Sequence, residues 1–257
     1  MKIQIFTEDR RKKKRSRKRK NNPSPSIMSV IRRILIWTRN LAFILVGLSL
    51  LATLTLRWIN PPYTSFMLVQ RISTDFTPYK INWVAIENIS PNLLIAVVAS
   101  EDQKFPQHHG FDFKAIQSAL EENKKQKRIR GASTITQQVA KNVFLWPKKS
   151  FFRKGLEAYF SLLIEMLWPK WRILEVYVNV AEFGPNVFGA KNAAYTHFKK
   201  TSKQLTQNEA STLAAVLPNP HKLHASQPSH YVQKRAADIS TQVRSLGGSA
   251  YLKPIWD

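Results

Sequence analysis

An adjacent pair of carboxylates, Glu101 and Asp102, follows a long apolar run and is the first place in this sequence where chemistry could occur. Val97 lies one helical turn before Glu101, so a helix over this segment would turn Glu101 toward its buried side. A carboxylate that loses water on one side holds a proton more readily and can act as a proton acceptor near neutral pH. The alternative is an ordinary solvated acid at a helix end.

The residues around this pair predict a helix that begins at Ser90 and Pro91. Serine is a favoured N-cap residue, and proline suits the first helical position. Apolar residues then recur at helical spacing, and Pro106 and Gly110 are expected to end the helix. Glu101 therefore belongs to its last turn.

A second polar group spans residues 131–142 and combines a glycine turn, hydroxyl groups and the free amides of a predicted helix start. Such a start can bind an anion. Gln137 and Lys141 lie one turn apart on one face of this helix. The alternative is a polar helix face in contact with water.

A third group spans residues 148–157 and carries Arg153 and Glu157 at a spacing of i, i+4. The ordinary interpretation is a surface ion pair that contributes ~0.3–0.5 kcal/mol. Together the three groups suggest two carboxylates flanked by cations that can hold a phosphate-bearing leaving group.

The elements that must position these groups are predicted to be helices. Asp112 can cap a helix that runs to a polar end at residues 121–130, and Thr206 with Glu209 forms a capping box. Further helices are predicted over residues 133–144, 152–167, 171–180, 210–217 and 231–246. No internal repeat and little strand patterning occur, so we expect a mainly α fold.

The charge of the chain is distributed unevenly. Of a net charge of +24, half lies in residues 1–40, which hold 14 Lys and Arg against 2 Asp and Glu. The run from Arg10 to Lys20 cannot bury enough apolar surface to order itself and predicts a disordered tail. A nucleic-acid arm is the alternative. The absence of cysteine excludes disulfides, thiolate metal sites and a cysteine nucleophile.

An uncharged stretch from Leu41 to Leu56, extended by apolar residues on both sides, approaches the ~20 residues needed to span a membrane. Trp37 and Trp58 suit the two interfaces. The run is longer than the apolar part of a cleaved signal peptide, which is the alternative. The basic tail then belongs in the cytoplasm, and everything after about Asn60 lies on the outer side, away from nucleic acid.

These observations predict four segments. A basic disordered cytoplasmic tail covers residues 1–33 and a transmembrane helix covers 34–59. Residues 60–90 form a connector, and residues 91–250 form the catalytic domain.

Five blocks of residues occur in order between Glu101 and Ala194. They are Glu101-Asp-x-x-Phe105-x-x-His-x-Gly110, Gly131-x-Ser-Thr-Ile-Thr-Gln-Gln138-x-x-Lys-Asn142, Arg153-Lys-x-x-Glu157, Ile173-Leu-Glu-x-Tyr-x-Asn179 and Gly189-x-x-x-Ala193-Ala194. In this order they closely resemble the signature motifs of glycosyltransferase family 51, the peptidoglycan glycosyltransferases. The resemblance extends from about Leu93 to Gly248. One transmembrane helix without a following transpeptidase domain resembles the monofunctional members of Gram-negative bacteria.

The resemblance implies a lysozyme-like helical glycosyltransferase domain that polymerises lipid II. Glu101 resembles the general base that takes a proton from the acceptor hydroxyl, while undecaprenyl pyrophosphate leaves the donor with inversion. Glu157 is included with Glu101 as a catalytic carboxylate. The residues that resemble the donor-side set are Ser133, Gln137, Lys141, Lys149 and Arg153.

Two positions in these motifs need comment. Lys149 stands where the family usually has an arginine, so the bidentate fork for a pyrophosphate is lost. Asp102 belongs to the first motif, but we expect it to order the helix end and to take no part in proton transfer.

Family analogy also implies surroundings for the enzyme. A divalent cation, Mg or Mn, could accompany the pyrophosphate near Glu157, whereas the histidines do not have the spacing of a zinc helix. The expected location is the inner membrane, single-pass, with the N-terminus cytoplasmic and the catalytic domain periplasmic. Expected partners are lipid II, the growing glycan strand, other cell-wall synthases and division proteins, but no nucleic acid.

Two other functions are compatible with parts of the sequence. A lysozyme-like or lytic glycan-cleaving enzyme would also use two carboxylates across a glycosidic bond. Its neutral leaving group would not need the cations of the second and third groups. A membrane-anchored protein that only binds anionic lipid is the other alternative, and it would not depend on Glu101.

Overall fold

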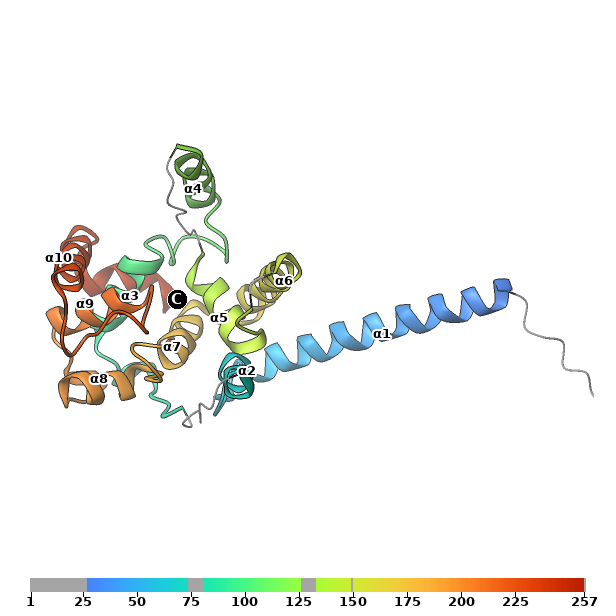
Figure 1. Cartoon of the computed structure of the whole chain (residues 1–257), viewed down its shortest axis with the longest axis horizontal. Coiled ribbons are helices and arrows are strands. Elements are labelled where there is room, and N and C mark those ends of the chain that lie inside the picture. The colour runs from blue at the N-terminus through green and yellow to red at the C-terminus, as the bar shows by residue number, and fades with distance from the viewer. Residues whose placement is uncertain (1–26, 74–80, 126–132, 149, 257) are drawn as a thin grey trace, which may run out of the picture. The chain divides into compact units, whose positions relative to one another are not determined.

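The computed structural model describes residues 27–73, 81–125, 133–148 and 150–256, and its regular elements are helices (Figure 1). An isolated β-bridge between Glu182 and Phe188 is the exception. The chain divides into two units, residues 1–47 and 48–257. The expectation of a mainly α fold is confirmed.

The first helix, α1 (Ile27–Thr55), is long and apolar enough to cross a membrane. Its 29 residues would extend about 44 Å at 1.5 Å per residue. Apolar side chains are exposed along much of its length, as expected of a helix whose natural surroundings are lipid. The helix extends further toward the N-terminus than the span expected over residues 34–59 and ends before Ile59.

The last turns of α1 belong to the second unit, and two residues of that unit bind them. The indole Nε1 of Trp168 donates a hydrogen bond of 2.7 Å to the carbonyl oxygen of Thr53. The Nη2 of Arg172 donates to the carbonyl oxygens of Leu56 and Ile59, at 2.9 and 3.2 Å. The bond from Trp168 satisfies a carbonyl group in the last turn of α1, and the bonds from Arg172 hold the residues that follow the helix.

The connector expected over residues 60–90 contains regular structure. Helix α2 (Ser65–Ser73) and the 3₁₀ helix η1 (Ile86–Asn88) lie in it. Met67, Ile81 and Ile86 from this segment are buried in the same core as the residues that follow. The connector is therefore part of the folded unit.

Helix α3 (Pro91–Glu101) forms the centre of the core, and every residue from Leu93 to Ala99 is buried. Its N-cap is Ser90, whose side chain accepts from the backbone N–H of Asn92, as the sequence predicts. Helices α9 (Gln207–Val216) and α10 (His230–Ser245) pack against it, and the 3₁₀ helix η3 (Gly248–Ile255) covers it further. A helix that is apolar on all sides needs such enclosure.

The second group of helices consists of α5 (Ile135–Phe144), α6 (Phe151–Leu167) and α7 (Lys170–Val180). Helix α5 packs against both of the others (Figure 1). Helix α8 (Ala190–Phe198) contacts α7, and α4 (Phe113–Lys125), capped by Asp112 as predicted, stands apart from this packing in Figure 1. The second and third polar groups of the sequence therefore lie on neighbouring helices.

The junction between α7 and α8 requires a glycine. Gly189 has a φ of +82°, and a Cβ atom there would lie 2.6 Å from the carbonyl oxygen of Asn179. Asn179 cannot easily move, because its buried side chain exchanges two hydrogen bonds with the backbone of Val84.

We therefore expect Gly189→Ala to lower the free energy of unfolding by about 2–3 kcal/mol, from backbone strain and from the collision with Asn179. The thermal unfolding midpoint of the detergent-solubilised protein would measure this. Gly155→Ala is the matched control, because a methyl group added at Gly155 in helix α6 would meet no atom within 4 Å and alanine favours a helix. An equal effect of the two substitutions would contradict the assignment.

Candidate active site

Glu101 is the last residue of α3, and its carboxylate is held on two sides. The Nε2 of Gln138 donates to Oε2 at 2.8 Å, and the hydroxyl of Ser100 donates to Oε1 at 3.3 Å. The Nη2 of Arg235 lies 3.9 Å from Oε1. With its side chain 15% exposed, Glu101 has lost most of its water without being sealed off. The alternative of an ordinary solvated acid does not describe this environment.

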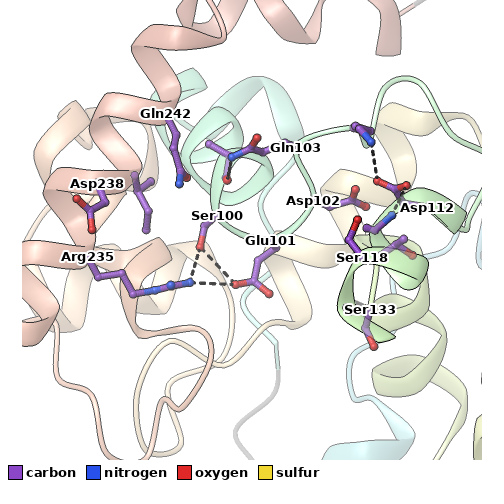
Figure 2. Close-up of a pocket in the computed structure, with 16 residues that line it drawn as sticks. Ser100, Glu101, Asp102, Gln103, Asp112, Ser118, Ser133, Arg235, Asp238 and Gln242 are labelled. Atoms are coloured by element: carbon purple, nitrogen blue, oxygen red, sulfur yellow. Dashed lines mark hydrogen bonds and ion pairs between the residues drawn. The ribbon is translucent and has the colours of Figure 1, made fainter. Parts of the chain in front are cut away.

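The carboxylate of Glu101 borders a cavity of about 610 Å³ (Figure 2). Helix α10 brings Arg235 toward Glu101 and Ser100 from one side, and Ser133 lies on the other side. The wall is rich in polar side chains and includes Lys104, Asp112 and Gln242. A cavity of this kind suits a polar, hydroxyl-rich molecule.

Asp102 ends helix α3, because its φ of −162° lies outside the helical region. The helix therefore ends at Glu101, which lies in its last turn as the sequence predicts, ahead of Pro106 and Gly110. One carboxylate oxygen of Asp102 lies 2.8 Å from Nε2 of His108, and the other accepts from the backbone N–H of Ile135 at 3.0 Å. Asp102 thus binds the start of α5 to the end of α3, in line with the ordering role expected for it.

The start of α5 uses one of the predicted site residues as a cap. The N-cap hydroxyl of Thr134 accepts from the backbone N–H of Gln137, and the Oε1 of Gln137 accepts from the backbone N–H of Thr134. Gln137 is buried by this capping box. Ser133, just before it, is exposed and lines the cavity.

Arg153 and Glu157 form an ion pair of 3.1 Å on α6, and both side chains are less than 10% exposed. The interpretation as a surface ion pair is therefore wrong. The i, i+4 spacing does bring the two groups together, but spacing alone does not reveal burial. Lys154 is bound to the other oxygen of Glu157, so both oxygens of this carboxylate have cationic partners. Lys149, the remaining predicted site residue, lies outside the described residues.

The charges of both predicted catalytic carboxylates, Glu157 and Glu101, act on Lys141. Burial is the main influence and lowers the pKa of its ammonium group. The charge of Glu157 raises this pKa, Arg153 lowers it, and Glu101 raises it. A partly dehydrated cation near Glu101 is able to bind an anion strongly, because water competes less with the ligand.

A second cavity of about 420 Å³ lies beside Lys141 and Gln138. Phe66 and Tyr177 also line it, and so do Glu182 and His221, whose Oε1 and Nε2 atoms lie 3.2 Å apart. Burial raises the pKa of Glu182, and the hydrogen bond from the backbone N–H of Asn186, followed by His221, offsets this in part. Gln138 therefore connects the second cavity with Glu101, which borders the first.

Several residues of this arrangement were not among the predicted site residues. Gln138 and Tyr177 belong to motifs quoted from the sequence, but their types did not set them apart from their neighbours. Arg235 and His221 lie outside the quoted motifs, and the packing of α10 on α3 brings Arg235 to Glu101. No local spacing in the sequence could have indicated that contact.

The described residues do not form a metal site. Within residues 27–73, 81–125, 133–148 and 150–256, no group of three or more His, Asp or Glu side chains could hold a metal ion. The oxygens of Glu157 are already bound by Arg153 and Lys154. The chain's own residues near Glu157 thus do not fit the divalent cation that family analogy suggested.

The arrangement suits transfer of a group from an anionic leaving group to a hydroxyl. Glu101 can accept a proton from a hydroxyl in the first cavity. Lys141, with the cations of Arg153 and Lys154 near it, can balance negative charge that develops on a departing phosphate.

Comparisons with known proteins agree with this chemistry. A family model described as Transglycosylase matches residues 68–244. A protein of Shewanella oneidensis named "Biosynthetic peptidoglycan transglycosylase" is 47% identical, over 86% of this chain and 95% of its own length. Proteins with the same name from Pseudomonas syringae and Xanthomonas campestris are each 48% identical, over 88% and 86% of this chain and 96% and 92% of their own lengths. The resemblance drawn from the five motifs is confirmed, and the chain belongs to the transglycosylase family.

Proposed function

We propose that this transglycosylase polymerises lipid II into peptidoglycan glycan strands during cell wall synthesis. The observation that carries the proposal is the carboxylate of Glu101, held at the edge of a large polar cavity with the half-buried cation of Lys141 nearby. The names of the relatives support peptidoglycan as the product.

In the proposed reaction, Glu101 takes the proton of the acceptor's 4-hydroxyl group as the hydroxyl oxygen attacks the anomeric carbon of the donor. The bond from this carbon to the phosphate oxygen breaks, and undecaprenyl pyrophosphate leaves with the bonding electrons. Attack opposite the leaving group inverts the anomeric configuration. Because a pyrophosphate is a good leaving group, positioned cations can replace a strong general acid.

Each predicted site residue has a part in this proposal. Lys141 and Arg153 would balance the charge of the pyrophosphate, together with Lys149. Glu157 would hold Arg153 and Lys154 in place, since it is bound to both. Ser133 is free to contact substrate in the cavity, whereas Gln137 would act by capping α5.

The location of the enzyme is also part of the proposal. We infer a single-pass protein of the inner membrane with its N-terminus in the cytoplasm. Helix α6 exposes Phe151, Leu162 and Met166, and its C-cap residue, Trp168, binds the last turns of α1. Apolar side chains next to the end of a span are suited to the bilayer interface. Partnership with other synthases or division proteins stays a prediction.

The first test replaces the base. Glu101→Gln should lower polymerisation of labelled lipid II by about 10²–10⁴-fold, because the amide cannot accept the proton. Glu87→Gln is the matched control, since Glu87 is exposed on η1. Polymerisation at the normal rate by folded Glu101→Gln would overturn the proposal. Shortening of preformed glycan by the wild type would instead favour a lytic enzyme.

A second test removes the half-buried cation of Lys141. Lys141→Met keeps an unbranched apolar side chain without the charge and should lower kcat/KM for lipid II by about 10–100-fold, through the loss of charge-assisted contacts to the pyrophosphate. Lys191→Met, at an exposed position of α8, provides the control. Steady-state kinetics with detergent-dispersed lipid II would measure both, and equal rates for the two variants would argue against an anion site at Lys141.

A third test concerns the membrane. Met166→Asp places a charge on the exposed apolar side of α6 and should reduce turnover of lipid II in vesicles several-fold more than turnover in detergent micelles. The charge control is Lys234→Asp on α10. Lys154 on α6 is not suitable, because it is bound to Glu157. Equal losses in vesicles and micelles would contradict contact of this surface with lipid.

A further inference from the structure

The side chain of Gln138 connects Glu101 to a buried tyrosine. Its Nε2 donates to Oε2 of Glu101 at 2.8 Å, and its Oε1 accepts from the hydroxyl of Tyr177 at 3.3 Å. The three residues come from α5, α3 and α7, so three separate helices meet at this chain of hydrogen bonds. Glu101, Gln138 and Tyr177 are not among the residues expected to bind the donor's pyrophosphate.

The hydroxyl of Tyr177 is suited to act as a permanent donor. Tyr177 is 1% exposed, and burial, with the charges of Glu101 and Asp102, raises the pKa of its hydroxyl well above the ordinary value. It therefore keeps its proton throughout the pH range in which the protein works. When this hydroxyl donates to the oxygen of the Gln138 carboxamide, the NH₂ group at the other end faces Glu101.

This orientation matters because a carboxamide can rotate by half a turn without changing its shape. In one orientation Gln138 presents N–H to Glu101 and stabilises the ionised carboxylate. In the other it would present its oxygen, which is compatible only with a protonated Glu101. Among the described residues, the Oε1 of Gln138 is the acceptor for the buried O–H of Tyr177, so the second orientation would leave that proton without an acceptor. Tyr177 therefore favours the first orientation and the form of Glu101 that can accept a proton.

We propose that Tyr177 is a positioning residue of this active site, which acts through Gln138 to hold the carboxylate of Glu101 in place for proton transfer. The inference rests on the proposed role of Glu101 as general base. Tyr177 touches no reacting atom in it. Its contribution is to fix the carboxamide, which in turn fixes the plane of the carboxylate.

The other charged groups that face Glu101 come from different elements. Arg235 approaches Oε1 from α10, Lys141 acts from α5, and Asp102 follows Glu101 in the chain. None of them is a hydrogen-bond partner of the Tyr177 hydroxyl among the described residues. Removing that hydroxyl therefore tests the Gln138 contact and leaves the surrounding charges unchanged.

The test is Tyr177→Phe, which removes one oxygen atom and keeps the aromatic ring. We expect kcat for lipid II polymerisation to fall about tenfold, the effect of one lost hydrogen bond, while KM changes less than about twofold. The acidic limb of the pH–rate profile should move to higher pH, because Gln138 is no longer fixed in the orientation that donates to the ionised carboxylate. Tyr159→Phe is the matched control, since its hydroxyl bonds Ser49 on α1, away from Glu101.

A double-mutant cycle separates positioning from general damage to the fold. Gln138→Met should lower kcat at least as much as Tyr177→Phe, and the double variant should be no slower than Gln138→Met alone. Independent, multiplicative losses would overturn the proposal, as would an unchanged kcat and acidic limb in folded Tyr177→Phe. If Tyr177→Phe does not fold, the test rests on Gln138→Met, whose position is half-buried. A wild-type kcat and an unshifted acidic limb in Gln138→Met would then overturn the proposal.

The outcomes distinguish this inference from the proposed function. Failure of the wild type to polymerise lipid II, or full activity of Glu101→Gln, would reject the proposed function itself. Normal dependence on Glu101 together with an inert Tyr177 would reject only the positioning role.

Discussion

Helix α3 has no polar face, and its need for enclosure determines where the site can be. All residues from Leu93 to Ala99 are buried, under α9, α10 and η3. The enclosure ends at Glu101, where the helix reaches the larger cavity. A carboxylate that terminates such a helix is held firmly, because the hydrophobic contacts behind it resist any movement of its backbone. The same packing of α10 on α3 brings Arg235 to the carboxylate.

Asp102, Glu157, Glu182 and Glu101 differ in their partners, and these partners separate their roles. Asp102 accepts from the backbone at the start of α5 and is committed to holding two helices together. Glu157 is neutralised by two cations, and Glu182 has His221 beside it. Glu101 is the one among these four whose hydrogen bonds come from an amide and a hydroxyl, with an arginine only at 3.9 Å. Its carboxylate is thereby oriented and still able to receive a proton.

Local chemistry made much of this arrangement predictable. The caps at Ser90 and Thr206 depend on neighbouring residues alone, and both act as the sequence predicts. Helices α5 and α9 begin at Ile135 and Gln207, near the predicted starts at residues 133 and 210 but not at them. Glu101 lies in the last turn of α3 as predicted, whereas the bond of Asp102 to the start of a segment some thirty residues away was not predictable. The burial of Arg153 and Glu157 and the approach of Arg235 were not predictable either, since both depend on how helices distant in sequence pack together.

The lowered pKa of Lys141 has a consequence for the binding and release of charged substrates at the site. Its ammonium group is dehydrated by the protein, and this favours loss of a proton. A diphosphate that settles beside the ammonium group reverses the preference, because an opposite charge at short range favours the ionised form. Arrival of each donor would thus strengthen the hold of the ammonium group on its proton, and departure of each leaving group would weaken it again.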